Sequence, residues 1–317
     1  MEHRLTPLTE GGLLAALTVL MAVMAVYLPV IGLIAALLWP VPVIVLVVRH
    51  GLRVGLLATA VATAITAMLI EPMAALRMTI AFAPSGLALG CGYRRRWPAV
   101  HVFLAALIAA VFAKIAAIGL MLAVTGIDPF ASQESMMEQA LGTTTELYAM
   151  MGMGDVERVA VENMMKQTME LVKLLIPFTV ILMGILDAAL NFFIAGRVLR
   201  RLGESAPTLP PFEEWQLPRL FLLVFGFSLV GMYWGSTRNL GGLYQASLNA
   251  ELLAVCAGLV QGVSLLWFAF GRYALSKPVR ILISFVLFTN GFLLQVAAFA
   301  GLFDMAFDYR RRFGRKG

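Results

Sequence analysis

Long apolar runs recur along the whole chain, with short polar connections between most of them. Nine runs can be recognised, at about residues 11–28, 30–48, 52–70, 74–92, 98–124, 171–196, 217–234, 248–271 and 279–307. Most are long enough to cross the hydrocarbon layer of a bilayer, where backbone groups must be hydrogen-bonded within their own segment. The pattern therefore predicts an all-α, polytopic transmembrane bundle of eight or nine spans. Pro40 and Pro42 predict a break or kink in the second run.

Basic residues gather at every second connection between the predicted spans. They are Arg4, Arg49, Arg53, Arg94 to Arg96, Arg197, Arg200, Arg201, Arg272, Lys277 and Arg280. Because cytoplasmic connections are enriched in arginine and lysine, we expect these connections and the N-terminus in the cytoplasm. Nine spans would leave the C-terminus outside, whereas the basic tail at residues 310–316 favours the inside. Either the last run is re-entrant or split in two, or an earlier run does not span.

The connection at about residues 125–170 is long enough to have structure of its own, with helices expected at 132–150 and 154–170. It has eight acidic and only two basic residues, which favours the extracytoplasmic side. It also has eight methionines, which is typical of a flexible apolar face lying on the membrane or on the bundle.

Composition excludes an ordinary soluble domain, because 61% of the residues are hydrophobic and only 13% are charged. The net charge of +6 could indicate nucleic-acid binding. The basic residues lie at the predicted cytoplasmic ends, however, so we expect the lipid bilayer as partner and no nucleic acid. Cys91 and Cys256 are too few for a disulfide framework and are expected to be free thiols.

Three features of the first 200 residues resemble the membrane-embedded substrate-binding subunits (S components) of energy-coupling-factor vitamin transporters. The features are T-E-G-G-L-L-A-A-L at residues 9–17, the proline-rich stretch at 39–57, and the glycine-rich stretch at 84–96. This resemblance implies a six-helix module that ends near Arg200, followed by about three further helices. We therefore place a domain boundary between residues 205 and 206, giving domains 1–205 and 206–317.

The whole chain resembles the YybS-like family of bacterial membrane proteins. The family pattern is visible in P-P-F-E-E-W-Q-L-P-R at residues 210–219 and in G-L-F-D-M-A-F-D-Y-R-R-R at 301–312. The resemblance implies a multi-pass protein of the bacterial cytoplasmic (inner) membrane. It supplies no substrate.

Small residues in the first helix are candidates for close helix packing. Gly12 and Ala16, together with Gly11 and Ala15, match the place where S components dock on their transmembrane coupling subunit. Packing inside the bundle is the alternative. Gly86 with Gly90 and Gly258 with Gly262 have the same four-residue spacing. Trp215 is either an interfacial anchor or part of a segment that docks a partner at the cytoplasmic face.

Ionisable residues inside apolar runs are costly and often mark function. Lys114 lies within the fifth run, and Asp187 and Asn191 lie one turn apart in the sixth. Their depths in the runs suggest an offset of roughly 10 Å, which argues against a direct pair of Lys114 and Asp187. Neither residue need be functional. Lys114 could extend its side chain toward the membrane surface, and Asp187 could form a hydrogen bond that only fixes the packing of a neighbouring helix.

Four polar residues lie near the predicted outer ends of helices: Glu71, Arg77, Asn249 and Glu251. Since S components bind their ligand near that face, the resemblance implies that these residues and part of 125–170 could line a pocket. The alternative is that each of these four residues lies at the membrane interface or in solvent and binds no ligand.

The sequence offers little support for catalysis. It has no phosphate-binding Walker A sequence and no hydrolase or metalloprotease motif, and its three histidines lack metal-ligand spacing. We therefore expect no enzyme, no metal and no cofactor. The leading hypothesis is a small-molecule binding or transport subunit without its own ATPase, with a membrane coupling subunit or another membrane protein as partner. The alternative is a membrane scaffold without a ligand.

Overall fold

The computed structural model describes residues 7–126 and 155–314, together with a few isolated residues between 135 and 150. The described part is all-α, as the apolar runs predict, and it contains no strand. The helix expected at 132–150 lies largely outside the described residues. The second helix expected in that connection, at 154–170, corresponds to α8 (Asp155–Leu174). Most side chains of α8 are exposed, but Met169 is buried.

The chain divides into two compact units, each described here by itself. Unit 1 comprises Met1–Lys173 and Thr179–Thr208, and unit 2 comprises Leu174–Phe178 and Leu209–Gly317. The sequence predicts a domain boundary between residues 205 and 206, and the division between the two units falls three residues later, after Thr208.

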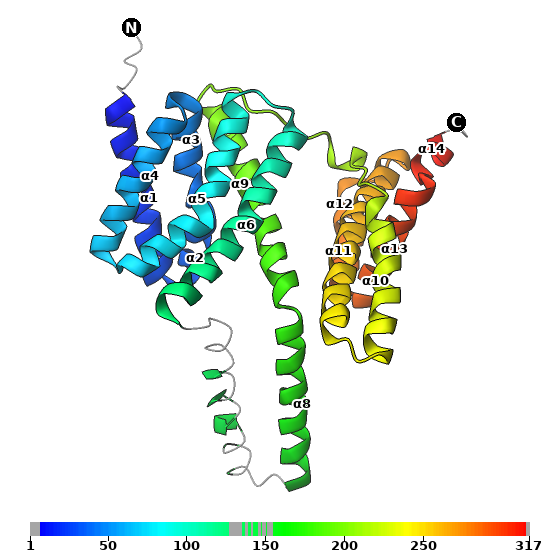
Figure 1. The fold of residues 1–317 in the computed structure, drawn as a ribbon. Helices are drawn as coiled ribbons and strands as arrows, with labels where there is room; N and C mark the ends of the chain where they lie inside the picture. The colour runs from blue at the N-terminus through cyan, green and yellow to red at the C-terminus, as the bar shows by residue number, and fades with distance from the viewer. Residues whose placement is uncertain are drawn as a thin grey trace. The chain divides into compact units, whose positions relative to one another are not determined.

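Unit 1 is a bundle of apolar helices in which α1, α3, α4 and α5 pack on one another and α6 packs along α5 (Figure 1). Its helices are α1 (Pro7–Tyr27), α2 (Pro29–Leu38), α3 (Pro40–His50), α4 (Leu52–Leu69), α5 (Pro72–Arg94), α6 (Ala99–Thr125), α8 as far as Lys173, and α9 (Ile176–Arg201) from Thr179 onward. The second apolar run is broken between α2 and α3 at Trp39, which confirms the break predicted from Pro40 and Pro42. Proline has no N–H to donate to the preceding turn, so the hydrogen-bond ladder is interrupted there.

Glycines allow α3 and α5 to approach closely. A Cβ atom on Gly86 would lie 2.9 Å from Cβ of Pro40, and one on Gly90 would lie 2.6 Å from Cβ of Val47. These contacts are too short for any larger residue, so this pair of small residues serves packing within the bundle.

The small residues of α1 face two directions. Gly11 is buried, and Ala15 is buried against Val19 and Ala62. Gly12 and Ala16 are exposed, and a Cβ atom on Gly12 would meet nothing within 4 Å. The predicted docking face therefore divides into an internal packing half and an outward half.

Unit 2 contains η1 (Phe212–Glu214), α10 (Leu220–Thr237), α11 (Gly241–Arg272), α12 (Lys277–Thr289), α13 (Gly291–Phe307) and α14 (Tyr309–Gly314). Its long helix, α11, packs on α10 and on α13 (Figure 1). Gly258 is so close to α13 that a Cβ atom on it would lie 2.6 Å from the Ala298 carbonyl oxygen, and Gly262 is closer still to Ala297.

Eight described helical segments are long and apolar enough to cross a membrane, with α2 and α3 counted as one. The last predicted run is instead two helices, α12 and α13, and the chain bends by 103° between them. Asn290 caps the second of them by accepting hydrogen bonds from the backbone N–H groups of Phe292 and Leu293. This bend fits the first of the two alternatives given above, a last run that is re-entrant or split in two.

Candidate functional site: buried polar clusters among apolar helices

Lys114 and Asp187 form a direct ion pair inside unit 1. Nζ of Lys114 on α6 lies 2.8 Å from Oδ2 of Asp187 on α9. The Asp187 side chain is fully buried, and the Lys114 side chain is 14% exposed. The ammonium group also lies 4.9 Å from the ring centroid of Phe82, where the electron-rich face of the ring stabilises a cation.

The expectation that the two charges lie at different depths was wrong. It placed the end of the sixth span near residue 196, whereas α9 continues to Arg201. Counted from the shared end of the bundle, Lys114 is fifteen residues after Ala99 and Asp187 is fourteen before Arg201. At about 1.5 Å per residue these distances are nearly equal, so the side chains meet without any shift of a helix.

Polar groups from two further helices complete the cluster. Ser85 Oγ on α5 donates to Asp187 Oδ2 at 3.2 Å, and Asn191 Nδ2 donates to Asp187 Oδ1 at 2.7 Å. Asn191 Nδ2 also lies 2.9 Å from the carbonyl oxygen of Leu37, in the last turn of α2. Four helices therefore contribute to one polar cluster inside the bundle.

One acceptor in this cluster has no partner. Asn191 is fully buried, and its Oδ1 atom has no hydrogen bond to any described residue. The cluster also lies where two helices are irregular, because Leu37 precedes the α2–α3 break and Pro84, next to Ser85, lies inside α5. A buried acceptor beside interrupted helices is a feature of substrate and ion sites in membrane transporters.

The outer-end residues predicted as pocket-lining fall in both units. Glu71 and Arg77 belong to unit 1 and are exposed, and Nη1 of Arg77 contacts Sδ of Met121 at 3.7 Å. Glu251 of unit 2 is partly buried on α11.

Asn249, also on α11, has a clear structural role. Its Oδ1 accepts from the backbone N–H of Phe178 at 2.7 Å, and its Nδ2 donates to the carbonyl of Leu174 at 2.7 Å. It thereby binds backbone groups of the Leu174–Phe178 segment, which belongs to unit 2 like Asn249 itself.

A second cluster of unit 1 connects the start of α1 with the end of α3. Glu10 is buried and forms an ion pair with Arg49, and Nε2 of His50 lies within hydrogen-bond distance, 2.7 Å, of Oε2 of Glu10. Arg49 also lies 3.3 Å from Glu204. Sequence analysis did not single out Glu10, although a carboxylate at the start of an apolar run was a visible signal.

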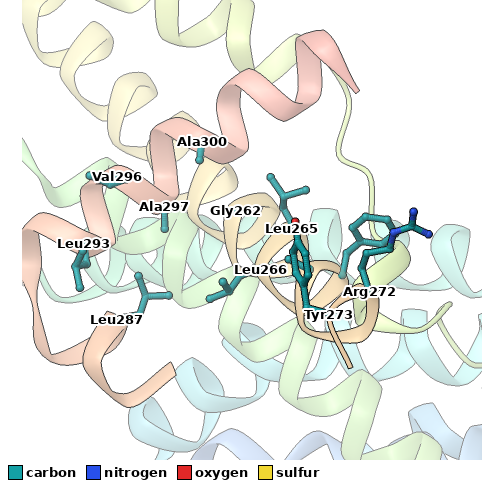
Figure 2. A pocket seen from close by; sticks show the side chains of 12 residues that line it. Gly262, Leu265, Leu266, Arg272, Tyr273, Leu287, Leu293, Val296, Ala297 and Ala300 are labelled. Carbon is teal, nitrogen blue, oxygen red and sulfur yellow. The ribbon is translucent and has the colours of Figure 1, made fainter. Parts of the chain in front are cut away.

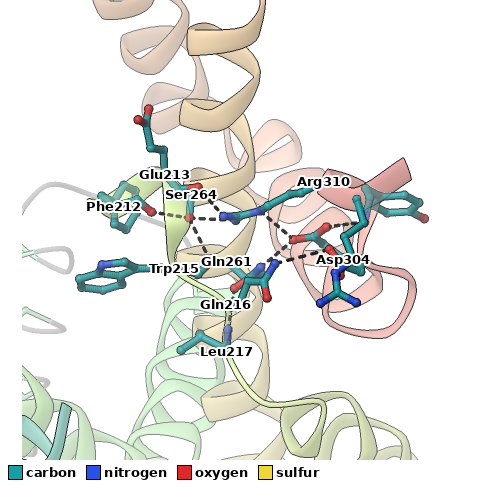
Figure 3. A network of polar contacts seen from close by, with 12 residues as sticks. Phe212, Glu213, Trp215, Gln216, Leu217, Gln261, Ser264, Asp304 and Arg310 are labelled. Carbon is teal, nitrogen blue, oxygen red and sulfur yellow. Dashed lines mark hydrogen bonds and ion pairs between the residues drawn. The ribbon is translucent and has the colours of Figure 1, made fainter. Parts of the chain in front are cut away.

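Unit 2 has its own buried network, centred on Arg310 (Figure 3). Nε of Arg310 pairs with Oδ2 of Asp304 at 3.5 Å, and its Nη2 donates to Ser264 Oγ at 2.9 Å. Gln261 Nε2 donates to the same aspartate oxygen at 2.6 Å. Arg310, Asp304, Gln261 and Ser264 are all buried.

This network holds the segment that precedes α10 against α11. Ser264 Oγ donates to the carbonyl of Phe212 at 2.5 Å, Gln261 Oε1 accepts from the N–H of Leu217 at 2.9 Å, and Arg310 donates to the carbonyl of Glu213 (Figure 3). Sequence analysis assigned Arg310 to a basic tail at the lipid surface. Its burial could not be foreseen, because the adjacent arginines have the same local sequence character.

Trp215 lies in this segment. Its Nε1 donates to the carbonyl of Pro210 at 3.0 Å, and its ring packs edge-on against Phe212 with centroids 5.1 Å apart. The side chain is half-buried within unit 2. Both predicted roles, interfacial anchor and partner docking, stay predictions.

These features define an all-α, multi-pass membrane protein with buried charged clusters. A family model described as "Predicted membrane protein (DUF2232)" matches residues 16–305, so the chain belongs to that family. It is also 25% identical to the "Uncharacterized protein YybS" of Bacillus subtilis (strain 168), over 96% of this chain and 97% of that protein. No solved structure matches the chain. The resemblance of the first module to S components stays a prediction.

Proposed function

We propose that this protein is a small-molecule binding or transport subunit without its own ATPase, and that its site is centred on Lys114 and Asp187. The observation that carries the proposal is the ion pair buried among the helices of unit 1. Charged side chains within a bilayer are costly, and membrane proteins retain them mainly where they contact substrates or ions. A coupling subunit with separate ATPases would supply the energy.

The polar surroundings of the pair support a binding role. Asn191 Oδ1 is a buried acceptor that a ligand, an ion or a water molecule could use. The Leu37 carbonyl beside it lies at the end of a broken helix, where backbone groups are available to ligands. The Lys114 side chain, which is not completely buried, provides a cationic group at the edge of the cluster.

The second candidate is a membrane scaffold that binds another protein and no ligand. One observation favours it: most donors and acceptors around the pair already satisfy one another. Asp187, for example, accepts hydrogen bonds from both Lys114 and Asn191, one on each carboxylate oxygen. A cluster of this kind can also serve only to fix helix packing.

Native mass spectrometry of the protein, extracted gently from its own membrane, distinguishes the two candidates. The wild type is compared with the double variant Lys114→Met/Asp187→Leu, which removes both charges together. Replacing a buried ion pair with apolar residues of similar size is often neutral or stabilising, so the double variant is expected to fold. Asn191 and Ser85 keep their backbone partners at Leu37 and Phe82 in this variant.

The expected result is a reproducible extra mass of a few hundred daltons on the wild type that is absent from the double variant. Retention of that mass by the double variant would place the ligand elsewhere and overturn the proposed site. A bare wild type that carries a stoichiometric protein partner would favour the scaffold, unless that partner is a coupling subunit with ATPases.

A further inference from the structure

Unit 2 contains an apolar pocket of about 580 Å³ between α11 and α13, with Leu287 of α12 also in its wall (Figure 2). Its volume lies within the range of roughly 300–1,000 Å³ that is usual for small-molecule sites. The wall is almost entirely aliphatic and aromatic, with Leu265, Leu293 and Ala300 among its residues. The pocket belongs to unit 2, whereas the Lys114–Asp187 cluster belongs to unit 1.

The pocket has a structural cause. α12 turns away from α13 by 103°, so it contributes little packing along the length of α11 and α13. Gly262 on α11 has no side chain, and its backbone is in contact with Ala297 on α13. The two helices pack closely along the stretch that holds Gly258, Gly262 and Gly301, and the volume beside this contact is left unfilled by side chains.

The polar residues of the pocket wall gather at one end. Figure 2 shows Arg272 and Tyr273 at the end of α11 on one side of the pocket and Leu287 and Leu293 on the other. The turn that carries the two polar residues is fixed by Arg280, whose Nε donates to the carbonyl of Leu275 at 2.9 Å. Lys277, at the start of α12, adds a further positive charge to the same turn.

We propose that this pocket binds one anionic phospholipid, with an acyl chain along the apolar wall and the phosphate at Arg272. A guanidinium group matches the geometry of phosphate oxygens, and tyrosine is favoured at the membrane interface. The end of α11 is also a predicted cytoplasmic end, where anionic lipid and basic residues attract one another. An acyl chain is the occupant that the surrounding bilayer supplies to an apolar pocket between spanning helices.

The test is native mass spectrometry of the full chain in detergent, with added phosphatidylglycerol or phosphatidylcholine of identical acyl chains. We expect the wild type to retain one phosphatidylglycerol molecule, with about fivefold preference over phosphatidylcholine. Arg272→Gln should abolish the preference, and Ala300→Phe, which fills the pocket, should reduce retention of both lipids. Ala300→Leu replaces the phenylalanine variant if that variant aggregates.

Two matched variants control for general effects. Arg238→Gln removes an arginine from the end of α10, where it stacks on Trp234, and Ala246→Phe enlarges an exposed alanine elsewhere on α11. Both should bind lipid as the wild type does. Equal retention by wild type and both Ala300 variants would overturn the proposal, as would a preference that survives Arg272→Gln. Displacement of the bound mass by inorganic phosphate alone would assign the site to a soluble anion instead.

Discussion

The Lys114–Asp187 pair is one of the charged clusters that this fold holds in a buried environment. Removing one partner leaves the other charge without compensation in an apolar environment, whereas removing both does not. The pair is therefore expected to behave non-additively, and this behaviour distinguishes it from an exposed pair such as Lys166 and Glu162 on α8.

We predict that Lys114→Met lowers stability by about 3–5 kcal/mol. The double variant Lys114→Met/Asp187→Leu should be at least as stable as the wild type. The stability of the single and the double variant can be measured by thermal unfolding in detergent, followed by size-exclusion chromatography. Lys166→Met, in which an exposed ion pair is lost, is the control and should change little. Equal destabilisation by the single and double variants would contradict an uncompensated buried charge.

At the level of helices, glycine positions decide which pairs can pack closely. α11 and α13 approach each other at Gly258, Gly262 and Gly301, and in each case a Cβ atom would overlap backbone atoms of the other helix. Backbone atoms cannot rotate away as a side chain can, so the helices themselves would have to separate.

Gly262→Ala is therefore expected to destabilise unit 2 by about 1–3 kcal/mol. Gly226→Ala on α10 is the matched control, because a Cβ atom there meets nothing within 4 Å. It should be neutral or slightly stabilising, since alanine favours a helix more than glycine does. The thermal midpoints of the two variants provide the measurement. A neutral Gly262→Ala would contradict a close backbone contact between α11 and α13 at this glycine.

For the whole molecule, the bend between α12 and α13 removes the conflict between the number of spans and the position of the basic C-terminal tail. Eight spans return the chain to the side on which it began, and a bent pair that does not cross leaves the C-terminus there too. Arg272, Lys277 and the tail arginines then all lie on the side where basic residues are favoured. Nine spans would place the tail on the opposite side.

Both termini are thus predicted to be cytoplasmic. Green fluorescent protein, which fluoresces in the cytoplasm, and alkaline phosphatase, which is active outside it, can each be fused after Gly317. We expect fluorescence and no phosphatase activity. The reverse pattern would mean that α12 and α13 together form a ninth span.

The sequence alone determined the class of the protein and the place of most of its helices. Apolar runs and prolines determine the structure of their own segment. The all-α fold and the break near Pro40 could therefore be predicted from them, and a split or re-entrant last run was one of two alternatives. Membership in the DUF2232 family, which the comparison shows, agrees with the YybS-like pattern recognised in the sequence. The candidate charges Lys114 and Asp187 were also visible, because ionisable residues are rare in apolar runs.

Which of these residues meet depends on how the helices pack in three dimensions. The pairing of Lys114 with Asp187 depends on where α9 ends, and an error of five residues shifts a side chain by about 7 Å. The burial of Arg310 depends on contacts with residues nearly fifty or a hundred positions away, at Ser264 and Glu213. The apolar pocket depends on the angle between two helices. Such long-range distances leave no mark in a local pattern of polar and apolar residues, because that pattern is set by the period of a single helix.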